Sequence, residues 1–421
     1  MIKHVYIETY GCTANQNNSE LIKARIVESG LDIVGNPKIA DLFIINTCIV
    51  KGKIENRIVG RLKELSKLNK PIILTGCIVP VRFRELKDKK DIYLLSLNNL
   101  KSIARLIREI NDKRYVFDDF NSKSNEIKLG RKLKENRYIG ITQISEGCLN
   151  SCSYCITKKA KGGLFNFPEQ RILEQVKNDL KAGSKEIWLT SQDNASYGLP
   201  EKPKLIDLLG KILEMKHKFR VRLGMMNPEN VLPILGELIE IYKNKKMYKF
   251  LHLPVQSASN KVLRDMGRKY KIKDFLEIVS KFKKEIPEIT LATDIIAGYP
   301  TESKQDFQQT ISLLKQVKPE IINLSRFWPR RGTKAATLKQ IDVKTQIKRT
   351  SEIMKLHRSF LPRQNYAEQE ALFTERQGDL YFGRLLDYKR VIVSCKRNLL
   401  GRFAKIRAKE VKGNYLVCEE V

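Results

Sequence analysis

The sequence predicts an α/β protein with three parts: a parallel-sheet α/β domain, a partial (βα)6 barrel and a small C-terminal β-barrel. Two stretches of alternating strand-like and helix-like segments indicate the first two parts. Short β-like runs separated by glycines indicate the third. We expect these parts at residues 1–112, 138–360 and 361–421, with a linker at 113–137.

In the first part we expect strands at residues 5–9, 42–46 and 71–75 and helices at 19–29 and 55–68, which implies a parallel sheet with right-handed crossovers. Cys12, Cys48 and Cys77 each lie one to three residues beyond the end of one of these strands. A single cysteine in such a place is usually a buried structural thiol. The repeated placement instead predicts that all three meet at the carboxyl edge of the sheet, where α/β sheets bind ligands.

Residues 111–137 are polar and lack apolar periodicity, so we interpret them as a connector. The barrel strands are expected at 139–145, 186–190, 221–225, 250–254, 290–296 and 321–327. Helices between them include one from Pro168 to before Gly183 and one with Phe307, Ile311 and Leu314 that ends before Pro319. Six βα units are too few to close an eight-stranded barrel, which predicts a partial barrel with its site at the carboxyl ends of the strands.

The chain has eight cysteines, and a long chain without a signal peptide is not expected to use them as disulfides. Cys148, Cys152 and Cys155 form a Cys-x3-Cys-x2-Cys run with no histidine and no fourth cysteine in the next 60 residues. Since a closed zinc site needs four ligands, this run predicts a metal centre with one open position, at the mouth of the barrel. Cys395 and Cys418 are expected to be ordinary thiols.

The chain carries 79 Lys and Arg against 47 Asp and Glu, a net charge of +32, which favours a polyanionic partner such as nucleic acid. A lysine-rich solvated surface is the alternative. No apolar run is long enough to span a membrane and no secretory leader is visible at Met1, so we expect a cytoplasmic protein.

The C-terminal part shows β-like runs at residues 370–374, 381–385, 391–394, 403–408 and 415–419. Its basic side chains, with Tyr381 and Phe382 nearby, suit RNA, although a solvated β surface would look similar. The predicted RNA-binding residues are Arg384, Lys389, Arg390, Lys396, Arg397 and Arg402.

The run GCLNSCSYC (residues 147–155) resembles the radical SAM signature, and the whole chain resembles the radical SAM methylthiotransferase family. Further segments that carry the resemblance are TYGCTANQNNSE (9–20), NTCIVKGKIENRI (46–58), GCIVP (76–80), SQDNASYG (191–198), RLGMMNPEN (222–230), HLPVQSASNKVLRDMGRKY (252–270), DIIAGYPTE (294–302) and PRRGTKAA (329–336). The motifs are most similar to the archaeal and eukaryotic branch. The resemblance implies a TIM-like radical SAM barrel followed by a TRAM domain.

The resemblance implies two 4Fe-4S clusters, one on Cys148, Cys152 and Cys155 and one on Cys12, Cys48 and Cys77. It also implies S-adenosylmethionine, cleaved to a 5′-deoxyadenosyl radical that activates C2–H of a tRNA adenine. At the strand ends, the expected contacts to this cofactor are Gln192, Asp193, Arg222, Gln256, Asp294 and Gly298. No side chain is assigned a catalytic role, and His252 is expected to be a satisfied strand histidine.

The branch implies methylthiolation of N6-threonylcarbamoyladenosine just 3′ of the tRNA anticodon, with an unidentified electron donor and sulfur source. Two alternatives keep the chemistry: isopentenyladenosine of tRNA, or an aspartate of a ribosomal protein. A third is a non-catalytic zinc-bearing RNA-binding protein, which metal and sulfide analysis would distinguish.

Overall fold

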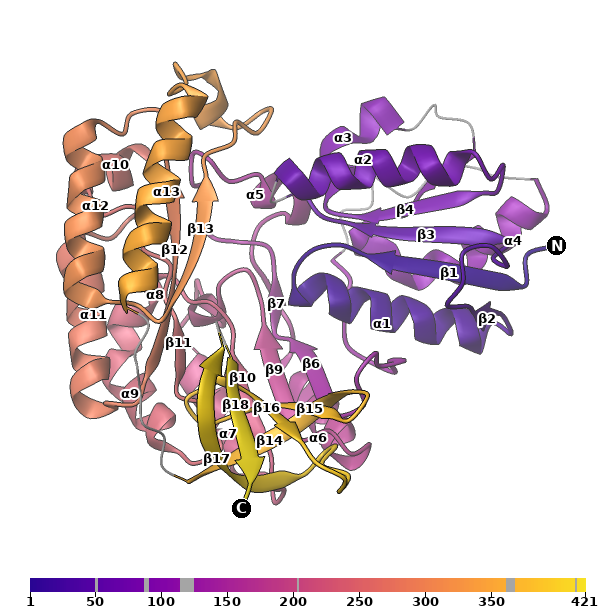
Figure 1. Ribbon diagram of the computed structural model, residues 1–421. Helices are drawn as coiled ribbons and strands as arrows, with labels where there is room; N and C mark the ends of the chain where they lie inside the picture. The colour runs from indigo at the N-terminus through magenta and orange to yellow at the C-terminus, as the bar shows by residue number, and fades with distance from the viewer. Residues whose placement is uncertain (50–51, 87–90, 114–124, 203, 361–367, 413–414) are drawn as a thin grey trace. The chain divides into compact units, whose positions relative to one another are not determined.

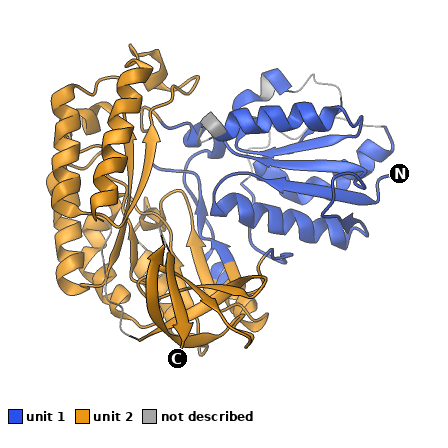
Figure 2. Ribbon diagram, in the orientation of Figure 1, with its two compact units in different colours: residues 1–135, 141–151, 155–172 blue, residues 136–140, 152–154, 173–421 orange. Residues whose placement is uncertain are grey.

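The computed structural model describes residues 1–49, 52–86, 91–113, 125–202, 204–360, 368–412 and 415–421 (Figure 1). Contacts within the chain group it into two compact units (Figure 2). The first comprises residues 1–135, 141–151 and 155–172, and the second comprises 136–140, 152–154 and 173–421. Among the described residues, no helix is long and apolar enough to cross a membrane.

The first unit is built on a parallel sheet of strand order β2-β1-β3-β4-β5 within the described residues. Its strands are β1 (His4–Thr9), β2 (Asp32–Ile33), β3 (Leu42–Thr47), β4 (Ile72–Gly76) and β5 (Ile92–Leu94). Its helices are α1 (Thr13–Glu28), α2 (Gly52–Ser66), α3 (Ile78–Leu86), the 3-10 turn η1 (Leu97–Ser102) and α4 (Ile103–Asn111).

Helices cover both faces of this sheet (Figure 1). Phe43 and Ile45 of β3 pack into one apolar cluster with residues of α2 and α3. Leu42 and Ile44 pack into another with residues of α1 and α4. Because both faces are covered, β3 is buried along its whole length, as strands of parallel sheets usually are.

The three expected strands and two expected helices of this unit are present, and the parallel arrangement is confirmed. Helix α1 begins at Thr13 rather than at residue 19, because its first turns are polar yet buried. Apolar periodicity cannot detect such a segment. The short strands β2 and β5 and the amphipathic helix α4 were also not predicted.

The expected connector, residues 111–137, lies partly outside the described residues, at 114–124. The part from 125 onward has neither helix nor strand, as expected, but it is not a solvated loop. Lys128 is completely buried, and Leu129 is 6% exposed. The segment therefore contributes to the interior of the first unit. The limits of the three expected domains stay a prediction.

All six expected barrel strands are present: β6 (Ile139–Gln143), β9 (Glu186–Thr190), β10 (Arg220–Leu223), β11 (Phe250–His252), β12 (Thr290–Ala297) and β13 (Ile321–Arg326). They form two sheets of order β10-β9-β6 and β11-β12-β13, with parallel pairing from β9 to β10 and from β11 to β13. Backbone bonds from Tyr248 N to Val221 O (3.0 Å) and from Met226 N to His252 O (3.0 Å) join β10 to β11. The strands thus follow one another in chain order, which confirms the partial barrel.

The helices between and after these strands are α6 (Glu169–Lys181), α7 (Leu205–Leu213), α8 (Pro228–Val231), α9 (Leu235–Lys243), α10 (Asn260–Asp265), α11 (Ile272–Glu285), α12 (Lys304–Val317) and α13 (Val343–Phe360). The 3-10 turns are η2 (Asn194–Ser196), η3 (Leu232–Ile234) and η4 (Lys334–Thr337). The two helices expected from their periodicity correspond to α6 and α12. Capping explains the start of α12, since Ser303 Oγ accepts from Asp306 N and the Asp306 carboxylate accepts from Ser303 N.

The C-terminal β-barrel is closed, with strand order β14-β15-β16-β18-β17. Its strands are β14 (Gln369–Gln377), β15 (Leu380–Arg384), β16 (Arg390–Ser394), β17 (Phe403–Lys412) and β18 (Tyr415–Glu420). Cys418 lies in the apolar core of this barrel and Cys395 packs against it, which confirms them as ordinary thiols.

A buried ion pair holds this β-barrel against the rest of the second unit. Arg384 of β15 lies 3.2 Å from the carboxylate of Glu186 of β9, and the two side chains are 7% and 0% exposed. The Arg384 guanidinium also lies over the rings of Trp188 and Tyr388. Truncating either member would leave the other charge buried without a partner, which costs more than losing an exposed pair.

We predict that Arg384→Ala lowers the free energy of unfolding of the second unit by about 3–5 kcal/mol, because the charge of Glu186 is left buried. Chemical denaturation followed by fluorescence would measure it. Arg402→Ala is the matched control, since Arg402 is exposed on the same β-barrel and its removal should cost no more than about 0.5 kcal/mol. Equal destabilisation of the two variants would contradict the prediction.

Candidate metal centres and cofactor site

Cys12, Cys48 and Cys77 follow three neighbouring parallel strands of the first unit. Strand β1 ends at Thr9, β3 at Thr47 and β4 at Gly76, so all three cysteines lie at one edge of the sheet. Cys12 is exposed at the N-cap of α1, whereas Cys48 and Cys77 are each 4% exposed. Gly11 has a φ of +119°, and a Cβ there would lie 2.9 Å from Cys48 Cβ. Only glycine allows this approach.

A polar network fixes the strand ends beneath these thiols. Asn15 Nδ2 donates to Tyr10 O and Thr47 O, each at 2.8 Å, and Asn46 Nδ2 donates to Asn15 O at 2.8 Å. Cys77 N donates to Thr47 O at 3.0 Å. The Asn15 side chain in the first turn of α1 therefore ties the ends of β1 and β3 together, and the backbone bond from Cys77 joins the end of β4 to β3. This is why a polar segment can be both helical and buried there.

The electrostatics of Cys77 show that the three thiols share one environment. Burial raises the pKa of Cys77 to about 11, the charges of Lys161 and Lys128 oppose this, and Cys12 and Cys48 add to it. No three His, Cys, Asp or Glu side chains in the described part of the chain could hold a single metal ion. A cubane cluster binds each thiolate through a different iron and so spaces its ligands more widely. Three thiols set around one sheet edge suit an iron–sulfur cluster, whose irons bind thiolates.

The Cys148–Cys155 run lies between β7 (Ser145–Glu146) and helix α5 (Thr157–Lys161), within the connection from β7 to its antiparallel partner β8 (Phe165–Asn166). Cys148 and Cys155 group with the first unit and Cys152 with the second. Within the first unit, Cys148 N donates to Gly162 O at 3.3 Å, which anchors the start of the loop. A loop with three thiols on such anchors suits an iron–sulfur cluster.

Within the second unit, Ser153 anchors the middle of the run. Its N–H donates to Met266 O (2.9 Å), its hydroxyl donates to Asp265 O (2.9 Å), and its carbonyl accepts from Ala335 N (2.8 Å). The hydroxyl also lies 2.8 Å from the phenol oxygen of Tyr299. The position of Cys152 therefore depends on contacts with three other segments: the end of α10, the loop after β12 and the turn η4.

A chain of polar contacts leads from Cys152 to the strand ends. Arg268 Nη1 donates to Cys152 Sγ at 3.4 Å, and its Nη2 donates to the side-chain oxygen of Asn227. Asn227 Nδ2 donates to Asp193 Oδ2 at 2.8 Å. Sequence spacing did not single out Arg268 or Asn227. Both lie in motif segments, but only the fold shows that they connect Cys152 to the loop after β9.

Asp193, predicted to contact the cofactor, is buried and accepts four hydrogen bonds. The donors are Ala195 N (3.2 Å), Asn227 N (3.0 Å), Asn227 Nδ2 (2.8 Å) and Asn230 Nδ2 (2.7 Å). Burial raises its pKa and the Asn227 and Asn230 donors oppose that shift. The carboxylate thus joins the loops after β9 and β10. Its neighbour Gln192 is half-buried at the same strand end.

The strand ends of β11 to β13 carry a second polar group. Asp294 Oδ1 lies 2.9 Å from His252 Nε2 and accepts from Asn323 Nδ2 at 2.8 Å. His252 is therefore a satisfied strand histidine, as expected. Gln256, with a φ of 64°, bonds through its backbone to Asp294 O and Ile296 N on β12. The fold brings Gln256 and Asp294 together at one end of this sheet.

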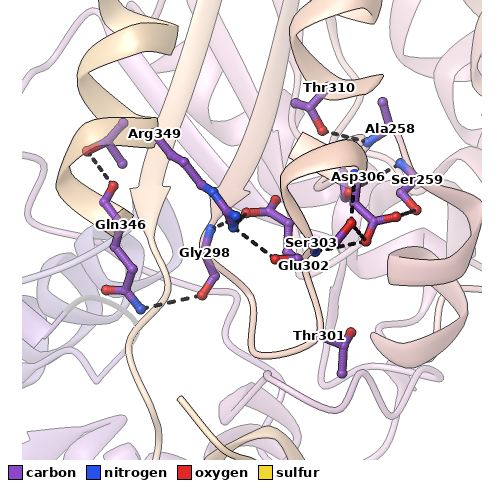
Figure 3. A network of polar contacts seen from close by, with 12 residues as sticks. Ala258, Ser259, Gly298, Thr301, Glu302, Ser303, Asp306, Thr310, Gln346 and Arg349 are labelled. Carbon is purple, nitrogen blue, oxygen red and sulfur yellow. Dashed lines mark hydrogen bonds and ion pairs between the residues drawn. The ribbon is translucent and has the colours of Figure 1, made fainter. Parts of the chain in front are cut away.

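Gly298, also predicted to contact the cofactor, begins a loop that α13 holds in place (Figure 3). Its N–H donates to Glu302 Oε2 at 2.8 Å, and Arg349 Nη1 binds the same oxygen at 2.5 Å. Gly298 has a φ of +78°, and a Cβ there would lie 2.6 Å from Cγ of Gln346. The loop after β12 is therefore closely packed and needs glycine at this position.

Arg222 occupies a different environment from the other predicted cofactor residues. Its guanidinium lies over the rings of Trp188, Phe250 and Tyr388, at 5.6, 5.4 and 5.9 Å. The loop that carries Tyr388 bonds to Lys249 N and Thr290 Oγ1, at the amino-terminal ends of β11 and β12. Because cofactors of such barrels bind at the carboxyl ends, we leave Arg222 out of the proposed cofactor set.

Four of the six predicted RNA-binding residues are exposed on the C-terminal β-barrel: Arg390, Lys396, Arg397 and Arg402. Arg390 lies over the ring of Tyr415, which in turn packs edge-on against Phe382. Cations beside half-buried aromatic rings are the usual elements of single-stranded RNA binding.

Of the remaining basic and aromatic assignments, those of Arg384 and Tyr381 need correction, whereas that of Lys389 stays a prediction. Arg384 is buried against Glu186, and the Lys389 ammonium lies 2.6 Å from the carboxylate of Asp387, half-buried. Tyr381, expected to be exposed, is 1% exposed in the barrel core because alternate residues of β15 face inward. The sequence shows that side chains alternate between the two faces of the strand, but it does not show which face lies in the barrel core.

A basic cavity of about 570 Å³ lies elsewhere in the second unit. Its lining residues are His217, Lys218, Phe219, Arg220, Lys245, Lys246, Glu370 and Leu386. Glu370 is the acidic member of this lining and pairs with Lys218 and Arg220. The basic surface of this unit therefore extends beyond the exposed cations of the β-barrel.

Residues 142–314 match the Radical SAM superfamily, and residues 4–96 match a family described as "Uncharacterized protein family UPF0004". The chain is 36% identical to the "Probable threonylcarbamoyladenosine tRNA methylthiotransferase" of Pyrococcus horikoshii, over 100% of this chain and 99% of that protein. It is 33% identical to the "Threonylcarbamoyladenosine tRNA methylthiotransferase" of Homo sapiens, over 96% of this chain and 72% of that protein.

Among solved structures, the chain is similar in fold to the radical S-adenosylmethionine methyltransferase TsrM of Kitasatospora setae, solved with cobalamin and a [4Fe-4S] cluster bound. The TM-score is 0.58 at 12% identity, covering 80% of this chain and 77% of that one. At this identity the likeness concerns the fold alone. It agrees with the partial barrel described above.

We predict that in the metal-free protein Cys77 is alkylated slowly at pH 8 and faster as the pH approaches 11. The reason is that only the thiolate reacts and burial raises the pKa of Cys77 to about 11. Peptide mass spectrometry after iodoacetamide treatment would measure it, with exposed Cys12 as the internal control. Equal labelling of Cys77 and Cys12 at pH 8 would show that water reaches Cys77.

The same shift makes stability depend on pH. An unfolded cysteine ionises near pH 8.5, whereas Cys77 in the folded protein stays protonated up to a pKa of about 11. Its contribution to stability is therefore present below about pH 8.5 and is lost as the pH rises towards 11.

Proposed function

This chain belongs to the radical SAM methylthiotransferase family, and we propose that it inserts a methylthio group at C2 of N6-threonylcarbamoyladenosine, just 3′ of the anticodon of tRNA. The observation that carries the proposal is the pair of cysteine sets on separate elements, within a chain similar over its length to relatives of that name. One set follows three parallel strands, and the other lies in the loop before α5.

Members of this family carry two [4Fe–4S] clusters and use S-adenosylmethionine. In our proposal Cys148, Cys152 and Cys155 hold one cluster and Cys12, Cys48 and Cys77 hold the other. When bound, these groups supply the radical chemistry that activates C2–H and the sulfur and methyl that replace the hydrogen.

The chain's own residues position these groups. Ser153 fixes the loop of the barrel cysteines, and Arg268 orients the Cys152 sulfur through the contact at 3.4 Å. Asp193 holds Asn227 so that Asn227 can accept from Arg268. Gln192, Gln256, Asp294 and Gly298 line the strand ends at which the methionine and nucleoside parts of the cofactor would bind.

The second unit supplies the RNA-binding surface in this proposal. The exposed cations of the C-terminal β-barrel would contact the phosphates of the anticodon stem-loop, and Phe382 and Tyr415 would stack on unpaired bases. The proposed reaction also requires an electron donor and a sulfur source as partners. A cytoplasmic location follows from a tRNA substrate.

The test is anaerobic reconstitution with iron and sulfide, followed by reaction with S-adenosylmethionine, a reductant and tRNA that bears either threonylcarbamoyladenosine or isopentenyladenosine. Mass spectrometry of the nucleosides should show the methylthio product on threonylcarbamoyladenosine alone. A product on isopentenyladenosine would keep the chemistry but change the assigned substrate. Cofactor cleavage without either product would point to a protein aspartate as the substrate. Zinc without sulfide in the purified protein would overturn the enzyme assignment.

We predict that Cys152→Ala abolishes reductive cleavage of S-adenosylmethionine, because the barrel cluster loses a ligand. Cys48→Ala should retain cleavage but form no methylthio product, because Cys48 belongs to the other proposed cluster, that of Cys12, Cys48 and Cys77. Chromatography of 5′-deoxyadenosine measures the first activity and nucleoside analysis the second. Cys395→Ala is the control and should keep both. Retained cleavage in Cys152→Ala, or full methylthiolation by Cys48→Ala, contradicts the assignment.

We predict that replacing Lys396 and Arg402 by Ala weakens tRNA binding, because fewer phosphates are neutralised. The slope of log affinity against log salt should fall by about 1 for each phosphate that is no longer neutralised. Fluorescence anisotropy at several salt concentrations measures it. Lys63→Ala removes an exposed charge from α2 of the first unit and should leave the slope unchanged. An unchanged slope in the double variant would mean that RNA binds elsewhere.

A further inference from the structure

Three charged side chains that no step above uses are buried together in the first unit. Lys128, Glu146 and Lys161 have side chains that are 0%, 5% and 2% exposed. Glu146 binds both lysines: Oε1 lies 3.1 Å from Lys161 Nζ, and Oε2 contacts Lys128 Nζ. We call these three residues the buried lysine pair and its carboxylate.

The carboxylate can neutralise only one of the two ammonium groups. The nearby carboxylate of Glu126 lies 2.7 Å from Arg25 and is therefore already paired. Burial lowers the pKa of Lys128 well below its ordinary value, and the charge of Lys161 adds to this, while Glu126 and Cys77 oppose it. A second buried cation is costly unless another anion lies beside it. Among the contacts of the described residues, Glu146 is the carboxylate that both lysines bind.

The lysine pair lies near the cysteines at the sheet edge. Ile156 and Ala160, next to and within α5, share one apolar cluster with Cys77 and Ile78. Lys161 is the last residue of that helix, and its side chain is 2% exposed.

The backbone of Lys128 is tied to the same region. Its carbonyl accepts from Asn17 Nδ2 at 3.1 Å, and Asn17 lies in α1, the helix that begins after Cys12. Two independent contacts, one through α5 and one through α1, therefore hold the lysine pair near the three thiols.

We propose that Lys128 and Lys161 are positioning residues that compensate the negative charge of the cluster bound by Cys12, Cys48 and Cys77, and that Glu146 holds both ammonium groups in place. This rests on the proposed function, which assigns a cluster to those cysteines. Three thiolates outweigh the charge of the iron–sulfur core, and each electron added makes the assembly more negative. Buried positive charge nearby stabilises the reduced form and raises the reduction potential.

A purely structural role explains the arrangement less well. One lysine and one glutamate would form a neutral buried pair, and apolar side chains would fill the volume at lower cost. The second lysine adds a charge that only an anion makes favourable. Glu146 also lies two residues before Cys148, so the experiment must distinguish the two clusters.

The test uses the full-length chain with Cys148, Cys152 and Cys155 replaced by Ala, reconstituted so that only the cluster of Cys12, Cys48 and Cys77 is present. Midpoint potentials are measured by dithionite titration followed by electron paramagnetic resonance, in which one electron passes from dithionite to the cluster. Lys128→Met and Lys161→Met should each lower the midpoint, and Glu146→Gln should raise it. A tenfold change in the redox equilibrium corresponds to about 59 mV for one electron. Lys63→Met, which removes an exposed charge from α2, should change nothing.

A packing defect would not shift the midpoint potential in opposite directions in the lysine and glutamate variants. Unchanged midpoints, or shifts of the same sign in all three variants, would overturn the proposal. So would a shift seen only in the converse background, in which Cys12, Cys48 and Cys77 are replaced and only the barrel cluster remains. If a Met variant loses its cluster, Lys161→Arg keeps the charge and should restore both iron content and midpoint; failure to restore them would indicate packing alone. A triple-Ala background that binds no iron would instead refute the second-cluster assignment itself.

Discussion

The constraint on which the rest of the first unit depends is the parallel pairing of β1, β3 and β4. Parallel neighbours end at the same edge, so three residues far apart in sequence come together without any covalent link. Asn15 and Asn46 then lock the register of the strand ends by hydrogen bonds between elements. The thiols of Cys12, Cys48 and Cys77 are placed by the sheet, and the buried lysine pair and its carboxylate shape their electrostatic environment from an adjoining helix and loop.

The barrel cysteines are positioned by a different principle. Their loop contains no regular structure from Gly147 to Ile156, and its placement depends on individual hydrogen bonds to distant segments. The contacts from Cys152 through Arg268 and Asn227 to Asp193 extend this control to the end of β9. Asp193 shows the result most clearly. It lies at the end of β9, and both of its carboxylate oxygens already accept hydrogen bonds that join two loops.

Much of this architecture could be predicted from the sequence because it is local. The alternation of strands and helices, the Cys-x3-Cys-x2-Cys run and the strand-end cysteines are all patterns over a few residues. What could not be predicted depends on burial across long separations. Lys128 looks like part of a polar connector, yet it is enclosed by residues of other elements, and Arg384 looks like a surface cation, yet it faces Glu186 nearly 200 positions earlier. The sequence predicts only which strand carries Arg222. The direction of its side chain depends on contacts such as that with Tyr388, which lies in another segment.

The anchoring of Ser153 also has a bearing on the order of events during translation. The cysteine run leaves the ribosome early, but the partners of Ser153 are Asp265, Met266, Tyr299 and Ala335, the last of which is made more than 180 residues later. The first unit's sheet is complete well before that point, since β5 ends at Leu94. Domains generally fold as they emerge, N-terminal first. The sheet edge that carries Cys12, Cys48 and Cys77 can therefore form before Ser153, and with it Cys152, has all of its partners.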